Sequence, residues 1–237
     1  MTRGQMARRL VAEFIGTALL LAAVVGSGIA AQRLSPNDVG LQLLENAAAT
    51  AAALVAIILA VGPVSGAHLN PAVTLADWIL GGVTRRLAAG YLVAQVLGAS
   101  VGTVLANLMF GLAAVDISSK ARTGPGLWLA EVVATFGLLL VIFGVVRSGR
   151  TAVVPFAVGA YIAGAYWFTA STSFANPAVT IARELSNTFA GISPGSVPGF
   201  LVAQLAGAGL AVVTIRFLYP DIAGVAGDVV VPQRDAR

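Results

Sequence analysis

The sequence predicts an all-α membrane protein with six transmembrane helices and two half-helices arranged in inverted repeats. Of its 237 residues, 58% are hydrophobic and only 10% are charged, whereas a soluble domain carries about 25% charged residues. The apolar runs are long enough for six crossings at roughly 20 residues each. The sequence Asn-Pro-Ala-Val-Thr also occurs twice, at 70–74 and 176–180, each time before a short apolar segment. A short interrupted segment in each half of a membrane protein indicates a site near the middle of the membrane.

The six expected spans are bounded by turns and charged residues. They cover about Arg9–Ala31, Leu43–Val61, Arg86–Phe110, Leu127–Val146, Ala152–Ala170 and Val197–Tyr219. The first run follows a basic N-terminus and lacks a small-residue cleavage site, so we expect a span rather than a removed signal peptide. The polar tail after Pro220 is expected to be loosely ordered.

Each Asn-Pro pair is a helix-start signal, because Asn is a preferred N-cap and Pro suits the first helical turn. The segment after Pro71 ends at Gly81-Gly82, and the segment after Pro177 is expected to reach about Asn187. Neither is long enough to cross a bilayer. Both are therefore predicted to be half-helices.

The two halves of the chain share more than this pair. Residues 12–17 (AEFIGT) match 130–135 (AEVVAT), and 92–95 match 201–204 (both LVAQ). We interpret residues 1–237 as one domain with repeats at about 9–110 and 127–219. Each repeat contains three spans, so the second repeat must be inverted relative to the first. The half-helices should then start from opposite faces and meet near the midplane.

The distribution of basic residues predicts the orientation. Of the 14 Lys and Arg residues, ten lie on the side of both termini and four on the other side. The four are Arg33, Lys120, Arg122 and Arg183. Because cytoplasmic loops carry the excess of positive charge, both termini are predicted to be cytoplasmic.

Two half-helix N-termini that face each other create a positive focus, since unpaired amides and the macrodipole give each end a partial positive charge. Such a focus disfavours cations and protons. The side-chain amides of Asn70 and Asn176 can donate hydrogen bonds to the oxygen of a neutral molecule.

The chain resembles the aquaporin or major intrinsic protein family over about residues 9–219. The resemblance rests on residues 12–17, on SGAHLNPAVT at 65–74, on YLVAQ at 91–95, and on Asn176-Pro177-Ala178. It implies an aquaporin-like hourglass fold, a pore in every subunit and a homotetramer. The expected pore motifs are Asn70-Pro71-Ala72 and Asn176-Pro177-Ala178.

Four buried polar residues and one histidine are expected to support the pore. Glu13 and Glu131 lie deep inside spans, where a carboxylate must face the bundle interior. They are interpreted as braces for the half-helix backbones, with a proton relay as the alternative. Gln95 and Gln204 are expected to be similar braces. His68, the only histidine, is expected to line the pore through its backbone carbonyl, and its ring either gates the pore or packs.

The chain departs from the family at the outer filter. Water- and glycerol-conducting members usually carry Arg directly after the second Asn-Pro-Ala, and here that position is Val179. Spacing from the two Asn residues places the other filter positions at Thr50, Gly164 and Ser173. This filter would contain no aromatic ring, His or Arg. Arg183, four residues after Val179, is an alternative source of this charge, but we expect it to pair with Glu184 or the lipid interface.

A small-residue filter implies a passive channel for water and neutral solutes such as glycerol, urea or metalloid hydroxides like arsenous acid. The alternatives are a water-selective aquaporin, an ion-coupled secondary transporter or a structural membrane protein that does not conduct. The sequence contains no cysteine and one histidine, so we expect no metal site and no cofactor. No nucleophile–base pair is recognisable, so an enzyme is not expected. The partners are expected to be lipid, water and solutes in a bacterial inner membrane, without nucleic acid.

Overall fold

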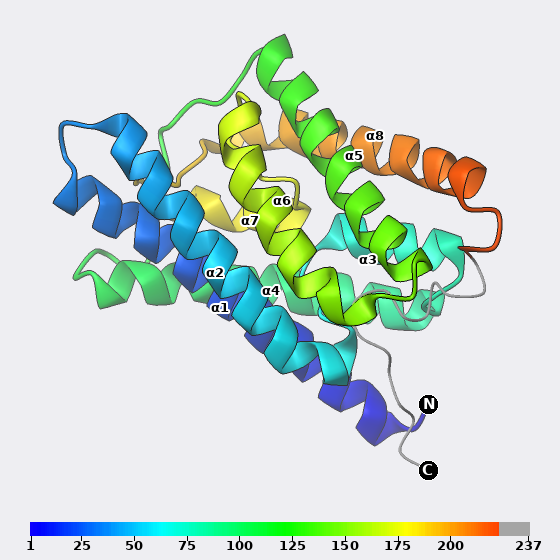
Figure 1. Cartoon of the computed structure of the whole chain (residues 1–237). Coiled ribbons are helices and arrows are strands. Elements are labelled where there is room, and N and C mark those ends of the chain that lie inside the picture. Colours follow the sequence, from blue (N-terminus) through cyan, green and yellow to red (C-terminus); the bar gives the residue numbers. More distant parts are fainter. Residues whose placement is uncertain (223–237) are drawn as a thin grey trace.

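A computed structural model describes residues 1–222 of the chain, and these form a bundle of helices (Figure 1). The long helices are α1 (Arg3–Leu34), α2 (Val39–Ser65), α4 (Arg85–Met109), α5 (Pro125–Arg147), α6 (Val154–Phe168) and α8 (Val197–Leu218). The short ones are α3 (Pro71–Leu80) and α7 (Pro177–Ala182). Three of these helices are flanked by a single 3-10 turn. η1 (Thr151–Val153) precedes α6, η2 (Arg183–Leu185) follows α7, and η3 (Pro194–Ser196) precedes α8.

The prediction of an all-helical chain with six spans is confirmed. Within residues 1–222, six helical segments are long and apolar enough to cross a membrane, with η1 extending α6 and η3 extending α8. The helices exceed the expected spans by a few residues at most ends, because polar caps outside the apolar runs continue them. Asp38, for example, caps α2 by accepting a hydrogen bond from the Leu41 amide. The polar tail that we expected to be loosely ordered lies largely outside the described residues, from position 223 onward.

The second half-helix is shorter than the sequence predicts. It ends at Ala182 instead of about Asn187, and η2 follows. Hydrogen bonds to the carbonyls of this segment explain the difference. A helix that continued to Asn187 would need the Arg183 carbonyl for the Asn187 amide, but this carbonyl accepts from the Ile192 amide at 3.4 Å. The next two carbonyls, of Glu184 and Leu185, accept from the amides of Ser118 and Asp116 in the loop before α5.

Two close helix crossings define the bundle: α1 packs along α4, and α5 packs along α8. Glycines make the first crossing possible, because a Cβ built on Gly98 or Gly102 of α4 would overlap the carbonyl oxygens of Phe14 and Ala18 in α1. Small residues that let helix backbones approach are the usual means of helix association in membranes.

Replacing Gly102 with Leu should therefore force α1 and α4 apart. We expect a loss of about 3 kcal/mol of stability, or roughly 6–12 °C in the thermal unfolding midpoint in detergent. Intrinsic tryptophan fluorescence can follow this transition. Gly209→Leu is the matched control, because Gly209 is also helical but a Cβ there would meet no atom within 4 Å. Equal midpoints for the two variants would contradict the tight crossing.

Candidate functional site

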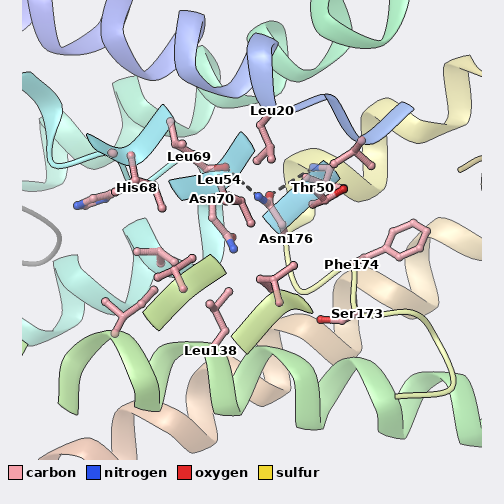
Figure 2. Close-up of a pocket in the computed structure, with 18 of the residues that line it drawn as sticks. Leu20, Thr50, Leu54, His68, Leu69, Asn70, Leu138, Ser173, Phe174 and Asn176 are labelled. Carbon is pink, nitrogen blue, oxygen red and sulfur yellow. Dashed lines mark hydrogen bonds between the residues drawn. The ribbon is translucent and has the colours of Figure 1, made fainter. Parts of the chain in front are cut away.

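The N-termini of α3 and α7 face each other and are joined by their capping asparagines (Figure 2). The Asn70 Oδ1 accepts from the Ala72 amide at 2.8 Å, while its Nδ2 donates to the carbonyl of Ala175 at 2.8 Å. Asn176 makes the equivalent pair of bonds from the other half-helix. Its Oδ1 accepts from the Ala178 amide at 3.0 Å, and its Nδ2 donates to the Leu69 carbonyl at 2.8 Å. Each amide nitrogen has two hydrogens, so one hydrogen on each asparagine remains for another acceptor.

The loops that lead into the half-helices adopt an unusual backbone conformation. Ala67, Leu69, Thr172, Ser173 and Ala175 all have positive φ, between 47° and 63°. None is glycine, and each such residue costs roughly 1–2 kcal/mol. These conformations need compensating contacts nearby.

Glu13 of α1 supplies such contacts to the first loop. Its carboxylate accepts hydrogen bonds from the amides of His68 at 3.0 Å and Leu69 at 2.7 Å. It also accepts from the Ser65 hydroxyl at 2.7 Å and from the Gln95 Nε2 at 2.8 Å. The carboxylate is fully buried, and these donors replace its hydration.

Glu131 of α5 does the same for the second loop. Its oxygens accept from the amides of Phe174 and Ala175, both at 2.9 Å. Gln204 of α8 donates through its Nε2 to Glu131 at 2.6 Å and to the Thr180 hydroxyl at 2.8 Å. Since both carboxylates bond to loop amides and to a glutamine, the geometry favours the brace over the proton relay.

A cavity runs past the paired asparagines, between the half-helices and the long helices. Its apolar wall is formed by side chains of α1, α2, α5 and α6, together with Val73 and Val179. These long-helix residues are Leu20, Val24, Leu54, Ile58, Leu138, Ile142, Val158 and Ile162. Asn70 and Asn176 add hydrogen-bond donors to this lining (Figure 2). The cavity thus combines an apolar lining with donors at the junction of the two half-helices.

One end of this cavity contains Thr50, Ser173 and Val179, three of the four expected filter residues. Gly164 is not among its lining residues, and the prediction that it faces the cavity is wrong. Gly164 is exposed on the outer side of α6, with Phe168 as its nearest neighbour. Spacing counted from Asn176 ignores the rotation of α6, where residues 158, 162 and 166 share a face and residue 164 points away.

Tyr166 lies where Gly164 was expected. Its ring lines the cavity, and its hydroxyl is 3.3 Å from the Thr50 Oγ1. The expected absence of an aromatic ring is therefore wrong as well. The helical repeat of Val158, Ile162 and Tyr166 is the sequence signal that identifies this face.

Arg183 also lines the cavity, contrary to the expectation that it pairs with Glu184 or with lipid. It is only 2% exposed. Its Nε donates to the carbonyl of Ala190, and its guanidinium carbon lies 3.5 Å from the centre of the Phe174 ring. Desolvation of so buried a charge requires contacts of this kind. The cavity therefore contains an arginine, although Val179 occupies the usual position.

Two further cations lie near Arg183 in the loop before α5. Lys120 donates to the carbonyl of Phe189, and Arg122 donates to those of Phe189 and Gly191. Burial, together with the like charges of Arg122 and Arg183, lowers the pKa of Lys120 to about 8. Arg122 and Lys120 thus bind carbonyls of the segment that also contains the Arg183 partner Ala190.

His68 lies at the opposite end of the cavity (Figure 2). Its Nδ1 is 3.0 Å from the Thr74 hydroxyl, and its Nε2 is 3.6 Å from an Asp77 oxygen. Its ring meets that of Tyr91 edge to face. The imidazole is thus held on three sides. Sequence reasoning missed Asp77, a buried acid seven residues after Asn70 in the half-helix.

If the Glu131 carboxylate holds the second loop, Glu131→Gln should lower the unfolding midpoint. The glutamine would keep one acceptor oxygen but present its NH2 group to the amide of either Phe174 or Ala175, so one of these bonds is lost. We expect a loss of about 2–3 kcal/mol or roughly 4–12 °C. Glu45→Gln is the control, since Glu45 is only partly buried and accepts a bond from Ser35 that glutamine can also accept. A midpoint for Glu131→Gln equal to that of the control would contradict the brace.

Comparison with known proteins supports the family suggested by these motifs. A family model described as major intrinsic protein matches residues 1–171. The chain is similar to "Aquaglyceroporin AqpS" of Rhizobium meliloti, with 55% identity over 213 residues that cover 90% of this chain and 91% of the relative. "Aquaporin AqpM" of Methanothermobacter marburgensis is 32% identical over 240 residues, covering 90% of this chain and 98% of the relative.

A solved structure has the same architecture. The X-ray structure of the aquaglyceroporin from Plasmodium falciparum matches with a TM-score of 0.73 and 24% identity, covering 92% of this chain and 98% of that one. At this identity the likeness concerns the fold. With its paired asparagine caps, carboxylate braces and sequence matches, the chain belongs to the major intrinsic protein family.

Proposed function

We propose that this protein conducts small uncharged hydroxylated solutes, with glycerol as the model solute, in addition to water. As a member of the aquaporin family the chain is a passive membrane channel and not an enzyme. The name of the 55% identical relative, an aquaglyceroporin, supports the choice of solute.

The observation that carries the proposal is the mixed lining of the cavity, apolar side chains together with the amide donors of Asn70 and Asn176. A polyol has carbon-bound hydrogens along one edge and hydroxyl groups along the other. The apolar wall from Leu20 to Ile162 suits the first edge, and the free N–H groups of Asn70 and Asn176 suit the second. The hydroxyl groups of a solute in this cavity can exchange hydrogen bonds with water for hydrogen bonds with the asparagine N–H groups, so they are not left unpaired.

The proposed filter consists of Thr50, Tyr166, Ser173 and Val179. Val179 is small and uncharged, which leaves more room than the usual arginine. Urea and undissociated metalloid hydroxides such as arsenous acid are of comparable size and polarity to glycerol, so we include them in the proposed solute class. A water-selective pore remains the competing outcome of the test below.

A secondary transporter coupled to an ion gradient fits the cavity less well. Such transporters bind cations with acidic side chains at the substrate site. The polar residues that line the described cavity are Thr50, His68, Asn70, Tyr166, Ser173, Asn176 and Arg183. Donors and one cation favour neutral solutes over cations.

The membrane arrangement follows from the sequence and the family. We propose that both termini lie in the cytoplasm, as the ten-to-four distribution of basic residues indicates. Family membership favours a homotetramer with one pore in each subunit. Similarity to a Rhizobium protein favours a bacterial membrane.

Stopped-flow light scattering on proteoliposomes tests the solute class. We expect fast shrinkage in an impermeant osmolyte, and fast reswelling when glycerol, urea or arsenous acid replaces it. Shrinkage without faster reswelling would establish a water-selective pore instead. No acceleration over protein-free liposomes in either phase would contradict a channel.

Val179→Arg should narrow the filter. We expect glycerol flux to fall by at least about tenfold, or roughly 1.4 kcal/mol in barrier height, while water flux changes less. Val179→Ile, which enlarges the side chain without adding a charge, is the control and should retain most glycerol flux. Unchanged glycerol flux in correctly folded Val179→Arg would show that Val179 does not limit passage.

A further inference from the structure

We infer that Arg183 is the cation-excluding and solute-orienting residue of this pore, supplied from one helical turn beyond the position where the family carries its arginine. The inference rests on the proposed channel function and adds a specificity-determining residue to it.

The position follows from helix geometry. Arg183 is four residues after Val179, so the two side chains leave the same face of the segment formed by α7 and η2. Side chains on a helix lean toward its N-terminus, which here directs Arg183 back toward the cavity. Valine at position 179 leaves space there. The result is that Val179 and Arg183 both line the cavity.

The guanidinium has donors to spare. Its Nε donates to the carbonyl of Ala190. Within residues 1–222, no protein acceptor is recorded for its two terminal nitrogens, and no carboxylate lies within salt-bridge distance of it. An almost fully buried arginine that lines a cavity and has unused N–H groups can donate to the oxygen of a passing solute.

The side chain is also fixed in place. Besides the Ala190 bond, it stacks on the Phe174 ring, whose amide is held by Glu131 at 2.9 Å. Burial, and secondarily the charge of Arg122, lowers the pKa of Arg183 to about 9, so it remains charged at pH 7. A fixed positive charge at a narrow point repels cations.

The test measures cation exclusion and solute size together. Proteoliposomes with an internal pH-sensitive dye report proton leak, and reswelling in glycerol, erythritol and ribitol reports the size limit. For Arg183→Leu we expect proton leak to rise roughly tenfold or more over wild type, with erythritol and ribitol admitted as well. Arg183→Gln removes the charge but retains an N–H donor for the Ala190 carbonyl, so we expect a similar rise in proton leak. This variant tests the inference even if Arg183→Leu folds poorly.

A transplanted arginine gives the sharper result. In the double variant Arg183→Leu and Val179→Arg, the guanidinium returns to the usual family position, and we expect proton exclusion to recover to within about threefold of wild type. Lys120→Met is the matched control, because Lys120 is bound to the same loop but does not line the cavity. It should leave leak and size limit unchanged.

Two results would overturn the inference. One is that folded Arg183→Leu and Arg183→Gln have the same proton leak and the same solute size limit as the wild-type protein. The other is an equal rise in leak for Lys120→Met, which would assign the effect to the loop and not to Arg183. Failure of the channel proposal is distinguishable, because it would appear as absent glycerol flux in the wild-type protein, whereas water flux and proton leak still report on Arg183.

Discussion

The reciprocal hydrogen bonds between Asn70 and Asn176 are the contact on which the rest of the structure depends. Each side chain caps its own half-helix and donates to the backbone of the opposite loop at 2.8 Å. Neither half-helix is long enough to be stable alone in its position. Joined at their N-termini, they place two positive dipole ends beside one cavity. The long helices then form the wall around this junction.

The junction has a conformational cost that the surrounding helices offset. Five non-glycine residues in the two loops adopt positive φ, and their amides point toward buried acceptors. Glu13 of α1 accepts from the amides of Leu69 and its neighbour His68, and Glu131 of α5 accepts from those of Ala175 and its neighbour Phe174. Gln95 and Gln204 complete each carboxylate's contacts from α4 and α8. The close α1–α4 and α5–α8 crossings thus keep the carboxylates at the height of the loops.

Much of this arrangement is predictable from the sequence, because it depends on local signals. The Asn-Pro pairs mark helix starts, and apolar length defines the six spans. The filter was harder to predict, because it depends on helix rotation and on side-chain reach. Counting twelve residues back from Asn176 selected Gly164, while the rotation of α6 brings Tyr166 to the cavity. The length of α7 also depends on contacts outside the helix, since the Arg183 carbonyl that a longer helix would need accepts from the Ile192 amide.

Arg183 shows why a motif position and a chemical function need not coincide. The motif specifies the residue after Ala178, where valine stands, and reading that position alone implies a pore without charge. The long arginine side chain spans about one helical turn, so a guanidinium can reach the same cavity from position 183. What determines its final place is the loop around it, through the Phe174 ring and the Ala190 carbonyl. Selectivity in such a pore therefore depends on where the charge rests in space, and a sequence comparison restricted to one column would miss it.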